Sequence, residues 1–303
     1  MYLVHWDAPE WCASSAASVL ASEGVQVELT VVDNGQRAST GPPMADLLPA
    51  GARVLAMSAN RGYSGGANAA LDDWRGRYPD GDLCLLASHD LHVEPDAVVR
   101  LVERARAEPD IGLLAPVLTR PQARSGGVWD GRRSHQVGLV AGGPELVERD
   151  WVSGACMLVR RACADAIGPF DERFGSYMED VDYGLRAGDQ GWRVAVLTSA
   201  EVWGLGTSTG DSLTLIASNT IVLAAKRGGW AGAGRGLALF GWWTAKGLAA
   251  GVAVWRAPEA RAVSRRYARQ RLAALTDPGT GRRVLATLRA RNAGRLRPLR
   301  DKS

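Results

Sequence analysis

Short apolar runs alternate with amphipathic segments along the first two thirds of the chain. The apolar runs are rich in Val, Leu and Ile and are predicted to be strands: residues 2–6, 25–34, 52–60, 82–88 and 111–118. The segments between them have helical spacing: residues 9–24, 64–78 and 94–108. Pro9 and Gly24 mark the two ends of the first helix. This order predicts an α/β fold, with a Rossmann-like, mostly parallel central sheet flanked by helices.

The pattern continues to about residue 205 and then changes. Further strands are predicted at residues 151–161, 192–198 and 200–205. After Gly210 the chain is predicted to be helical, with basic amphipathic helices at residues 258–277 and 281–294. We therefore expect a body, residues 1–210, whose two halves meet near residue 117, and a C-terminal helical extension, residues 211–303.

The segment Trp230–Trp255 is apolar, rich in Gly, Ala and Trp, and long enough to span a bilayer. Arg235 and Lys246 interrupt it, and each charge near a bilayer centre costs about 2.5–3.5 kcal/mol. We therefore expect a packed or interfacial helix pair instead of a spanning helix. Its tryptophans and the nearby arginines favour attachment to a membrane surface. The alternative is packing on the body or on a second subunit, as in a homodimer.

Charge is distributed unevenly along the chain. From Arg256 onward there are 14 Lys/Arg against 3 Asp/Glu, and before it 22 against 29. An acidic body with a basic tail indicates either two separate functions or a catalytic body with a tail that binds a surface. The tail has little aromatic interleaving beyond Tyr267, which argues against a nucleic-acid partner.

The cysteines and the N-terminus bear on the compartment. The four cysteines are scattered without a C-x-x-C pair, which predicts free thiols in a reducing compartment. Residues 1–6 show neither a basic leader nor a small-residue cleavage site. We expect a cytoplasmic protein, peripheral at the inner face of the plasma membrane if the tail binds lipid.

Two of the predicted strands carry an aspartate at their carboxyl ends, the edge where open α/β sheets bind ligands. Asp33 is a candidate acceptor for a nucleobase N–H or a ribose hydroxyl, although Asn34-Gly35 is also typical of a plain turn. Asp90 is a candidate for holding a divalent cation against a diphosphate. Residues 59–71 follow a strand and open a helix; their glycines serve either phosphate binding or tight helix–sheet packing.

Three carboxylates, Glu179, Asp180 and Asp182, open another predicted helix. The helix dipole stabilises acids in a first turn by about 0.3–1 kcal/mol each, which accounts for one or two of them. The preceding residues 170–178 are rich in aromatic and apolar side chains. A carboxylate beside them would be partly desolvated, and its raised pKa would make it a better general base.

Together, residues 31–35 (VVDNG), residues 60–71 (NRGYSGGANAAL), the strand ending at Asp90, and residues 152–197 strongly resemble the family 2 glycosyltransferases of the GT-A fold. Within that family the chain looks most like bacterial rhamnosyltransferases. The resemblance covers about Tyr2 to Arg227 and is most specific from Gly154 to Trp192. It implies inverting transfer of a sugar from a nucleoside-diphosphate donor to an acceptor hydroxyl.

The resemblance also implies roles for individual residues. Asp180 matches the catalytic base, with Glu179 as the alternate. Trp151 and Gly154 would face the acceptor. The residues that would bind the donor are Trp6, Asp7, Asp33, Asn60, Arg61, Gly62, Gly65 and Asp90. Asp90 also matches the last acid of the D-x-D-like motif and would bind Mg²⁺ or Mn²⁺.

Two departures from the family pattern affect the expected metal site. Ser88 stands where the first acid of the D-x-D-like motif would be, and Gly204 stands at the position of a usual histidine. The acceptor is expected to be a saccharide or lipid-linked saccharide of the cell envelope. The alternatives are an enzyme of secondary-metabolite (antibiotic) biosynthesis and a catalytically degenerate partner subunit that only binds a sugar nucleotide.

Overall fold

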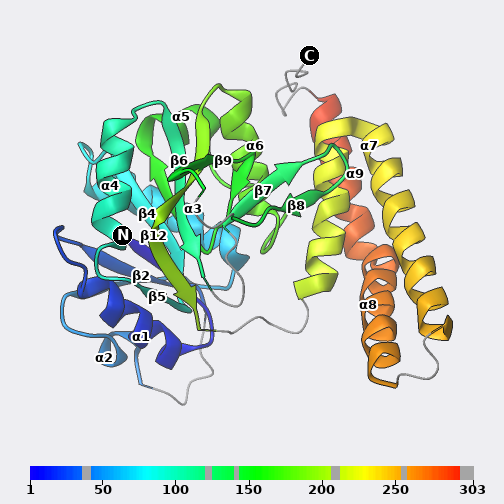
Figure 1. Ribbon diagram of the computed structural model, residues 1–303, viewed down its shortest axis with the longest axis horizontal. Coiled ribbons are helices and arrows are strands. Elements are labelled where there is room, and N and C mark those ends of the chain that lie inside the picture. Colours follow the sequence, from blue (N-terminus) through cyan, green and yellow to red (C-terminus); the bar gives the residue numbers. More distant parts are fainter. Residues whose placement is uncertain (36–41, 120–124, 140–142, 206–211, 254–257, 294–303) are drawn as a thin grey trace. The chain divides into compact units, whose positions relative to one another are not determined.

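A computed structural model describes residues 1–35, 42–119, 125–139, 143–205, 212–253 and 258–293 (Figure 1). They form two compact units, the first made of Met1–Val128 and His135–Thr207 and the second of Trp129–Ser134 and Ser208–Ser303. The boundary expected between residues 210 and 211 lies outside the described residues.

The first unit contains a large mixed sheet in the strand order β3-β2-β1-β4-β11-β6-β12-β5, with β9 also paired to β12. The strands of this sheet are β1 (Tyr2–His5), β2 (Leu29–Asp33), β3 (Ala52–Ala56), β4 (Leu83–Ser88), β5 (Leu91–Val93), β6 (Ile111–Leu118), β9 (Leu146–Glu148), β11 (Cys156–Arg160) and β12 (Arg193–Gly204). A smaller sheet has the order β10-β7-β8, formed by β7 (Gly126–Trp129), β8 (Ser134–Gln136) and β10 (Trp151–Val152).

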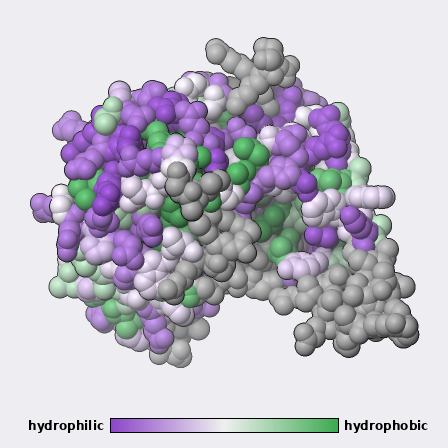
Figure 2. Space-filling model, viewed as in Figure 1, coloured by the Kyte–Doolittle hydropathy of each residue, from purple (hydrophilic) through white to green (hydrophobic). Residues whose placement is uncertain are grey.

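Helices cover the faces of the large sheet (Figure 1). They are α1 (Pro9–Leu20), α2 (Met44–Leu47), α3 (Gly62–Arg77), α4 (Ala97–Ala107), α5 (Arg161–Ile167) and α6 (Glu179–Asp189). Two hydrophobic cores result: one on the side of α1 and α4, with Leu3, Val31 and Leu101, and one on the side of α3 and α6, with Leu71, Met157 and Tyr183. The outer surface seen in Figure 2 is largely hydrophilic, with small apolar patches.

Strand direction brings distant segments to one edge of the sheet. β1, β2, β3 and β4 run parallel, so His5 pairs with Asp33 and Val4 with Ser88 at their carboxyl ends. β11 is antiparallel to β4, and Cys156 at its start lies opposite Ala87 near the end of β4. The loop that precedes β11 therefore meets the carboxyl ends of the parallel strands.

The α/β prediction is confirmed, with local differences. Residues 192–198 and 200–205, predicted as two strands, form the single strand β12, whose pairing is irregular between Leu197 and Glu201. The strand predicted from residue 25 begins at Leu29. The short strands β5, β7, β8 and β9 were missed because three or four residues show no usable alternation. All four cysteines are buried free thiols whose pKa burial raises to about 12, so they are unreactive.

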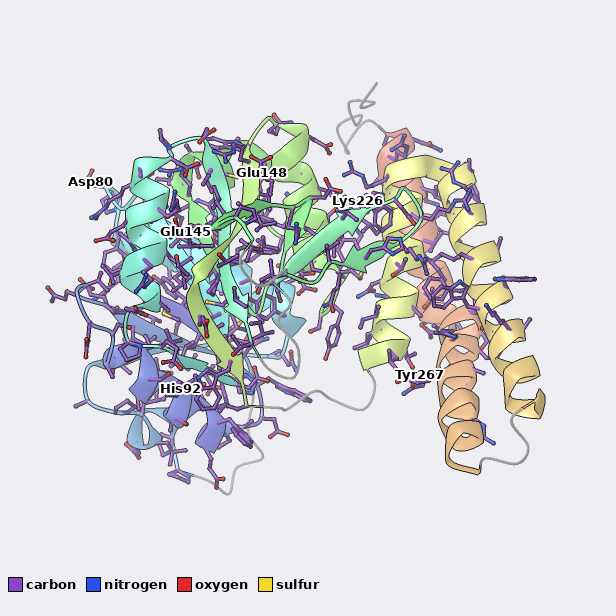
Figure 3. All side chains as sticks on the ribbon, in the orientation of Figure 1. Asp80, His92, Glu145, Glu148, Lys226 and Tyr267 are labelled. Atoms are coloured by element: carbon purple, nitrogen blue, oxygen red, sulfur yellow. The ribbon has the colours of Figure 1, made fainter. Side chains whose placement is uncertain are left out.

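The second unit is built from α7 (Ser212–Ala253), α8 (Pro258–Thr276) and α9 (Pro278–Asn292). α7 turns back on itself at Gly229, whose backbone angles of φ 60° and ψ −145° are not helical. Its second half packs on its first so closely that a Cβ at Gly232 would lie 2.0 Å from the Ala224 carbonyl oxygen. Asp277 caps α9 by accepting hydrogen bonds from the Gly279 and Thr280 N–H groups at 3.0 and 2.7 Å. Figure 3 labels Lys226 on α7 and Tyr267 on α8.

Among the described residues, no helix is both long and apolar enough to cross a membrane.

Candidate active site

The carboxyl ends of β1 and β2 hold a buried histidine–aspartate pair. His5 has no exposed surface, and its Nδ1 lies 3.2 Å from Asp33 Oδ1. The Ala8 N–H donates to His5 Nε2 at 3.2 Å, so Nε2 is the acceptor and Nδ1 carries the proton donated to Asp33. His5 therefore orients the carboxylate that the sequence marks as a nucleobase ligand. Sequence reasoning missed His5; its position opposite Asp33 in parallel strands was the available signal.

Asn34 joins the end of β2 to the start of α3. Its Oδ1 accepts from the Arg61 N–H at 3.0 Å, and its Nδ2 donates to the Gly62 carbonyl oxygen at 2.7 Å. Asn60 Oδ1 accepts from the Gly62 N–H at 2.7 Å. Both amides thus hold the loop predicted to border the donor. Sequence reasoning treated Asn34 as half of a turn dipeptide. In the structure its side chain also holds the loop before α3.

Trp6 and Asp7 follow β1 on the same edge. The Trp6 indole is 46% exposed and packs on Gly35, where a Cβ would lie 3.0 Å from Trp6 Cδ1. Asp7 has a left-handed backbone, with φ 49°. This part of the edge therefore presents an aromatic ring and a carboxylate beside the His5–Asp33 pair, which suits a planar nucleobase and a ribose.

The start of α3 lies against residues 172–176 with almost no space between the two backbones. A Cβ at Gly62, whose φ is +70°, would lie 2.5 Å from the Gly175 carbonyl oxygen. The Ser64 N–H donates to that oxygen at 2.8 Å, and the Tyr63 N–H donates to Ser176 Oγ at 3.0 Å. We call this contact between residues 61–64 and 172–176 the seam. It joins the predicted donor side to the segment that leads into α6.

Two further residues predicted to bind the sugar donor, Arg61 and Gly65, lie at or next to the seam. The Arg61 guanidinium pairs with Glu172, with Nε 3.1 Å from Oε2, and both side chains are largely exposed. Gly65 lies against the Arg61 side chain, whose Cβ would be 2.3 Å from a Cβ at position 65. Glycine at 65 therefore lets Arg61 lie along the first turn of α3.

Asp180 lies in the first turn of α6, half-buried. Its Oδ2 accepts from the Gly154 N–H at 3.0 Å, and its Oδ1 accepts from the Val181 N–H at 2.8 Å. Burial raises the pKa of Asp180, and these two hydrogen bonds oppose that rise by favouring the carboxylate. The result is an anchored carboxylate with more basicity than an ordinary aspartate.

The neighbours of Asp180 differ in burial. Glu179 is 5% exposed, and burial and then the Asp180 charge raise its pKa well above the ordinary value. Asp182 is 1% exposed and accepts from Arg186 Nε at 2.9 Å, within α6. Glu179 and Asp182 are thus buried in the helix packing, which leaves Asp180 as the more accessible carboxylate of the three.

Tyr63 connects the seam to the loop that holds Asp180. Its hydroxyl donates to the Gly154 carbonyl oxygen, and burial raises its pKa well above the usual range. Gly154 is enclosed by both partners, since a Cβ there would lie 3.2 Å from Asp180 Cβ and 3.4 Å from Tyr63 Cε1. Sequence analysis predicted that Gly154 faces the acceptor. The structure adds Tyr63, whose side chain holds the Gly154 backbone in place.

Trp151 lies apart from the exposed part of the site. It is 4% exposed on β10, and its Cα would be 2.6 Å from a Cβ at Gly184 of α6. Within the described residues its indole N–H has no hydrogen-bond partner. Gly154 is buried too, so the two residues predicted to face the acceptor both lie beneath the surface.

Strained backbone conformations occur just after β1 and just before α6. The non-glycine residues with positive φ in the described parts of the chain are Asp7, Tyr177 and Met178, with φ of 49°, 68° and 73°. Each such residue costs about 1–3 kcal/mol and tends to occur at functional sites. Tyr177 and Met178 lead directly into α6 and set the direction in which Asp180 leaves the backbone.

Asp90 follows β4 at the same sheet edge. Its Oδ1 accepts from Ser88 Oγ at 2.7 Å, and its carbonyl oxygen accepts from the Leu205 N–H at 2.8 Å. The end of β12 thus lies beside Asp90, and Gly204 pairs with Leu91 there. A histidine at position 204 would lie next to Asp90.

Asp90 has few possible metal ligands near it among the described residues. Over the described ranges, no three His, Cys, Asp or Glu side chains gather as metal ligands. His92, labelled in Figure 3, lies against the ring of Trp203, with centroids 4.4 Å apart. His89 packs edge-on against His5 at 5.1 Å. One carboxylate still fits Mg²⁺ or Mn²⁺, because such ions take the rest of their ligands from substrate phosphates and water.

Comparisons with known sequences bear on the family. Residues 4–220 match the profile of the family described as Glycosyltransferase like family 2. The N-acetylglucosaminyl-diphospho-decaprenol L-rhamnosyltransferase of Mycobacterium tuberculosis is 31% identical over 240 residues, 67% of this chain and 76% of the relative. The O-antigen biosynthesis protein RfbC of Myxococcus xanthus is 31% identical over 140 residues, 41% of this chain and 11% of that protein.

Comparisons with solved structures bear on the fold. The mannosyltransferase PcManGT from Pyrobaculum calidifontis, in complex with GDP-Man and Mn²⁺, has a TM-score of 0.56 at 14% identity, covering 90% of this chain and 84% of its own. GalNAc-T7 with UDP, GalNAc and Mn²⁺ has a TM-score of 0.56 at 12% identity, covering 69% of this chain and 43% of its own. The expected GT-A fold is confirmed. The chain belongs to the family 2 glycosyltransferases, where it is similar to bacterial rhamnosyltransferases.

Proposed function

We propose that this enzyme transfers a sugar, with inversion, from a UDP- or dTDP-sugar to a hydroxyl of a cell-envelope saccharide or lipid-linked acceptor. The observation that carries the proposal is the Asp180 carboxylate. It is half-buried, anchored by the Gly154 N–H and more basic than usual. The rhamnosyltransferase of Mycobacterium tuberculosis and the O-antigen protein of Myxococcus xanthus support the cell-envelope assignment by their names.

In this mechanism Asp180 accepts the proton of the acceptor hydroxyl. The hydroxyl oxygen forms a bond to the anomeric carbon on the face opposite the diphosphate, and the bond from that carbon to the diphosphate oxygen breaks. A single displacement needs one base on the acceptor side, which Asp180 supplies, and inverts the configuration.

The donor is assigned to the carboxyl edge of β1, β2 and β4. Asp33, oriented by His5, would accept from the nucleobase, and the exposed Trp6 ring would lie along it. Asn60, Arg61 and Gly62 would border the diphosphate. Arg61 would leave its exposed partner Glu172 to bind the diphosphate. Asp90 would hold Mg²⁺ or Mn²⁺, which neutralises charge on the leaving diphosphate when bound.

The base assignment is tested by Asp180→Asn. The variant keeps the shape of the side chain but cannot take a proton, so the transfer rate should fall at least about 100-fold, the low end of what a general base contributes. Donor binding, measured by calorimetry with UDP and dTDP, should be unchanged. Asp189→Asn, at the other end of α6, is the control and should transfer sugar at the wild-type rate. Full activity in Asp180→Asn would remove Asp180 from the base role.

The pH dependence gives a second readout of the same assignment. The base must be ionised, and the pKa of Asp180 is raised. Activity should therefore be lost as the pH falls through this raised pKa, at a higher pH than for an ordinary aspartate. The acidic limb should be absent from the residual activity of Asp180→Asn.

A binding-only subunit is the second candidate, because Gly204 beside Asp90 supplies no imidazole. Release of free sugar from the donor with Mg²⁺ or Mn²⁺ separates the two candidates. An enzyme should hydrolyse the donor slowly without an acceptor, whereas a binding subunit should retain it intact.

A further inference from the structure

The second half of α7, after Gly229, carries large apolar side chains that the rest of the structure leaves uncovered. Trp230 is 64% exposed, Leu237 46% and Trp242 67%. In the first unit, by contrast, most large apolar side chains are buried. An exposed apolar surface of this kind marks an interaction site.

These side chains share one side of the helix. Successive helical residues are about 100° apart around the axis, which places the exposed apolar positions on one continuous arc of about 140°. We call this arc the α7 face; its exposed residues are Trp230, Ala231, Gly234, Leu237, Ala238, Trp242 and Ala245. Arg235 and Lys246, both exposed, follow at one border of the arc.

The opposite side of the same helix is packed. Gly232 and Gly236 lie against Ala224 and Ile221 of the first half of α7. Thr244 is buried beside Leu237, at the border of the α7 face, and its hydroxyl donates to the Phe240 carbonyl oxygen at 2.8 Å. One side of this helix therefore packs within its own unit. The other side presents exposed apolar side chains bordered by two basic residues.

Charge indicates what would cover the α7 face. From Ser212 to Ala253, α7 contains four Lys or Arg residues and no Asp or Glu. The chain from Arg256 onward adds 14 Lys/Arg against 3 Asp/Glu. A second copy of this helix would bring cations against cations, with no acid on α7 to pair with them. An anionic lipid surface offers both the apolar region and the negative charge.

We propose that the α7 face binds an anionic membrane surface, with its tryptophans and Leu237 in the headgroup region and Arg235 and Lys246 against lipid phosphates. Tryptophan is enriched at this depth of a bilayer, and basic residues beside an amphipathic helix add attraction to anionic lipids. Because binding needs neither donor nor acceptor, the proposal stands independently of the proposed transfer reaction.

The test is co-sedimentation of the full chain with vesicles of phosphatidylcholine, alone or mixed with phosphatidylglycerol. The wild-type protein should sediment with the mixed vesicles, less at high salt, and much less with phosphatidylcholine alone. The double variant Trp230→Glu, Trp242→Glu should lose at least about tenfold in affinity, because it places two carboxylates in the contact. Its circular dichroism should match that of the wild type, since both side chains are exposed.

Three further variants distinguish specific binding by this face from nonspecific adsorption. Trp11→Glu changes another exposed tryptophan, 41% exposed on α1, and should bind vesicles as the wild type does. Arg235→Ala and Lys246→Ala should each weaken binding to mixed vesicles about fivefold, the loss expected for one basic residue near such a surface.

The outcomes that would overturn the proposal are definite. They are absence of wild-type binding to mixed vesicles, or equal binding by the Trp230→Glu, Trp242→Glu variant. A dimer that the same variant dissociates, with no vesicle binding by the wild type, would identify a second copy as the occupant and would also overturn it.

Discussion

Glycine serves opposite purposes at the start of α3 and on the α7 face. Gly62 is required by contact, because its backbone is left-handed and a Cβ would lie 2.5 Å from the Gly175 carbonyl oxygen. Gly234 and Gly241, on the second half of α7, would place a Cβ in open space with nothing within 4 Å. One region uses glycine to bring two backbones together, and the other has glycines that no contact among the described residues explains.

At the seam the contact partner is another segment of the chain. For the α7 face we propose a partner outside the chain. At the seam, the small residue is part of a network within the chain that runs through Tyr63 and Gly154 to Asp180. On α7, a glycine in a helix interior costs about 0.5–1 kcal/mol relative to alanine with no internal gain. A smooth surface between Trp230 and Trp242 is consistent with a partner outside the chain.

The largest effect is expected at the seam. Gly62→Ala should destabilise the protein by about 2–6 kcal/mol, because it combines backbone strain of about 1–3 kcal/mol with overpacking of similar size. Urea unfolding measures this loss, and the transfer rate should fall with it as the seam opens.

The control for Gly62→Ala lies on the same helix. Gly76, near the end of α3, is exposed and would place a Cβ in open space, so Gly76→Ala should leave stability unchanged or slightly raised. Equal stability of the Gly62→Ala and Gly76→Ala variants would show that the contact with Gly175 is not a constraint.

A smaller effect is expected one residue further along. Tyr63→Phe removes the hydroxyl that holds the Gly154 carbonyl, a hydrogen bond worth about 0.5–1.5 kcal/mol. If that bond aligns the base, kcat should fall about 2- to 10-fold with donor KM unchanged. The acidic limb of the pH profile should move to higher pH, because a displaced Gly154 N–H no longer favours the Asp180 carboxylate.

Tyr78→Phe is the matched control for Tyr63→Phe. Tyr78 follows the last turn of α3, and its hydroxyl donates to Glu28, away from Asp180. This variant should keep both kcat and the pH profile. A Tyr63→Phe enzyme that loses stability but keeps its pH profile would reduce Tyr63 to a packing role.

The sequence predicted the parts of the site that depend on strand ends and local motifs. Asp33 and Asp90 were proposed because parallel strands place their carboxyl ends on one edge, and the acids of α6 were proposed because they form a continuous motif. His5, Asn34 and Tyr63 were missed as positioning residues. Their roles depend on hydrogen bonds to residues that only the folded chain brings near, such as Tyr63 to Gly154.

Backbone conformation was the other limit of sequence reasoning. Tyr177 and Met178 have left-handed φ angles that glycine would signal in a sequence but that tyrosine and methionine conceal. α7 shows the same limit. Its apolar, tryptophan-rich composition is evident from the sequence, but only the turn at Gly229 determines which side of the helix is packed and which is exposed.

The smallest expected effects are on α7, where two glycines two residues apart should respond with opposite sign. Gly234→Ala should stabilise the second half of α7 by about 0.5–1 kcal/mol, because the exposed methyl meets nothing and alanine favours the helix. Gly232→Ala should destabilise it, because its methyl would lie 2.0 Å from the Ala224 carbonyl oxygen. Amide hydrogen exchange of the peptide spanning residues 230–246 measures both changes locally. Slower exchange in Gly232→Ala, or faster exchange in Gly234→Ala, would mean that the packed and exposed sides of this helix have been assigned the wrong way round, and the α7 face would have to be redrawn.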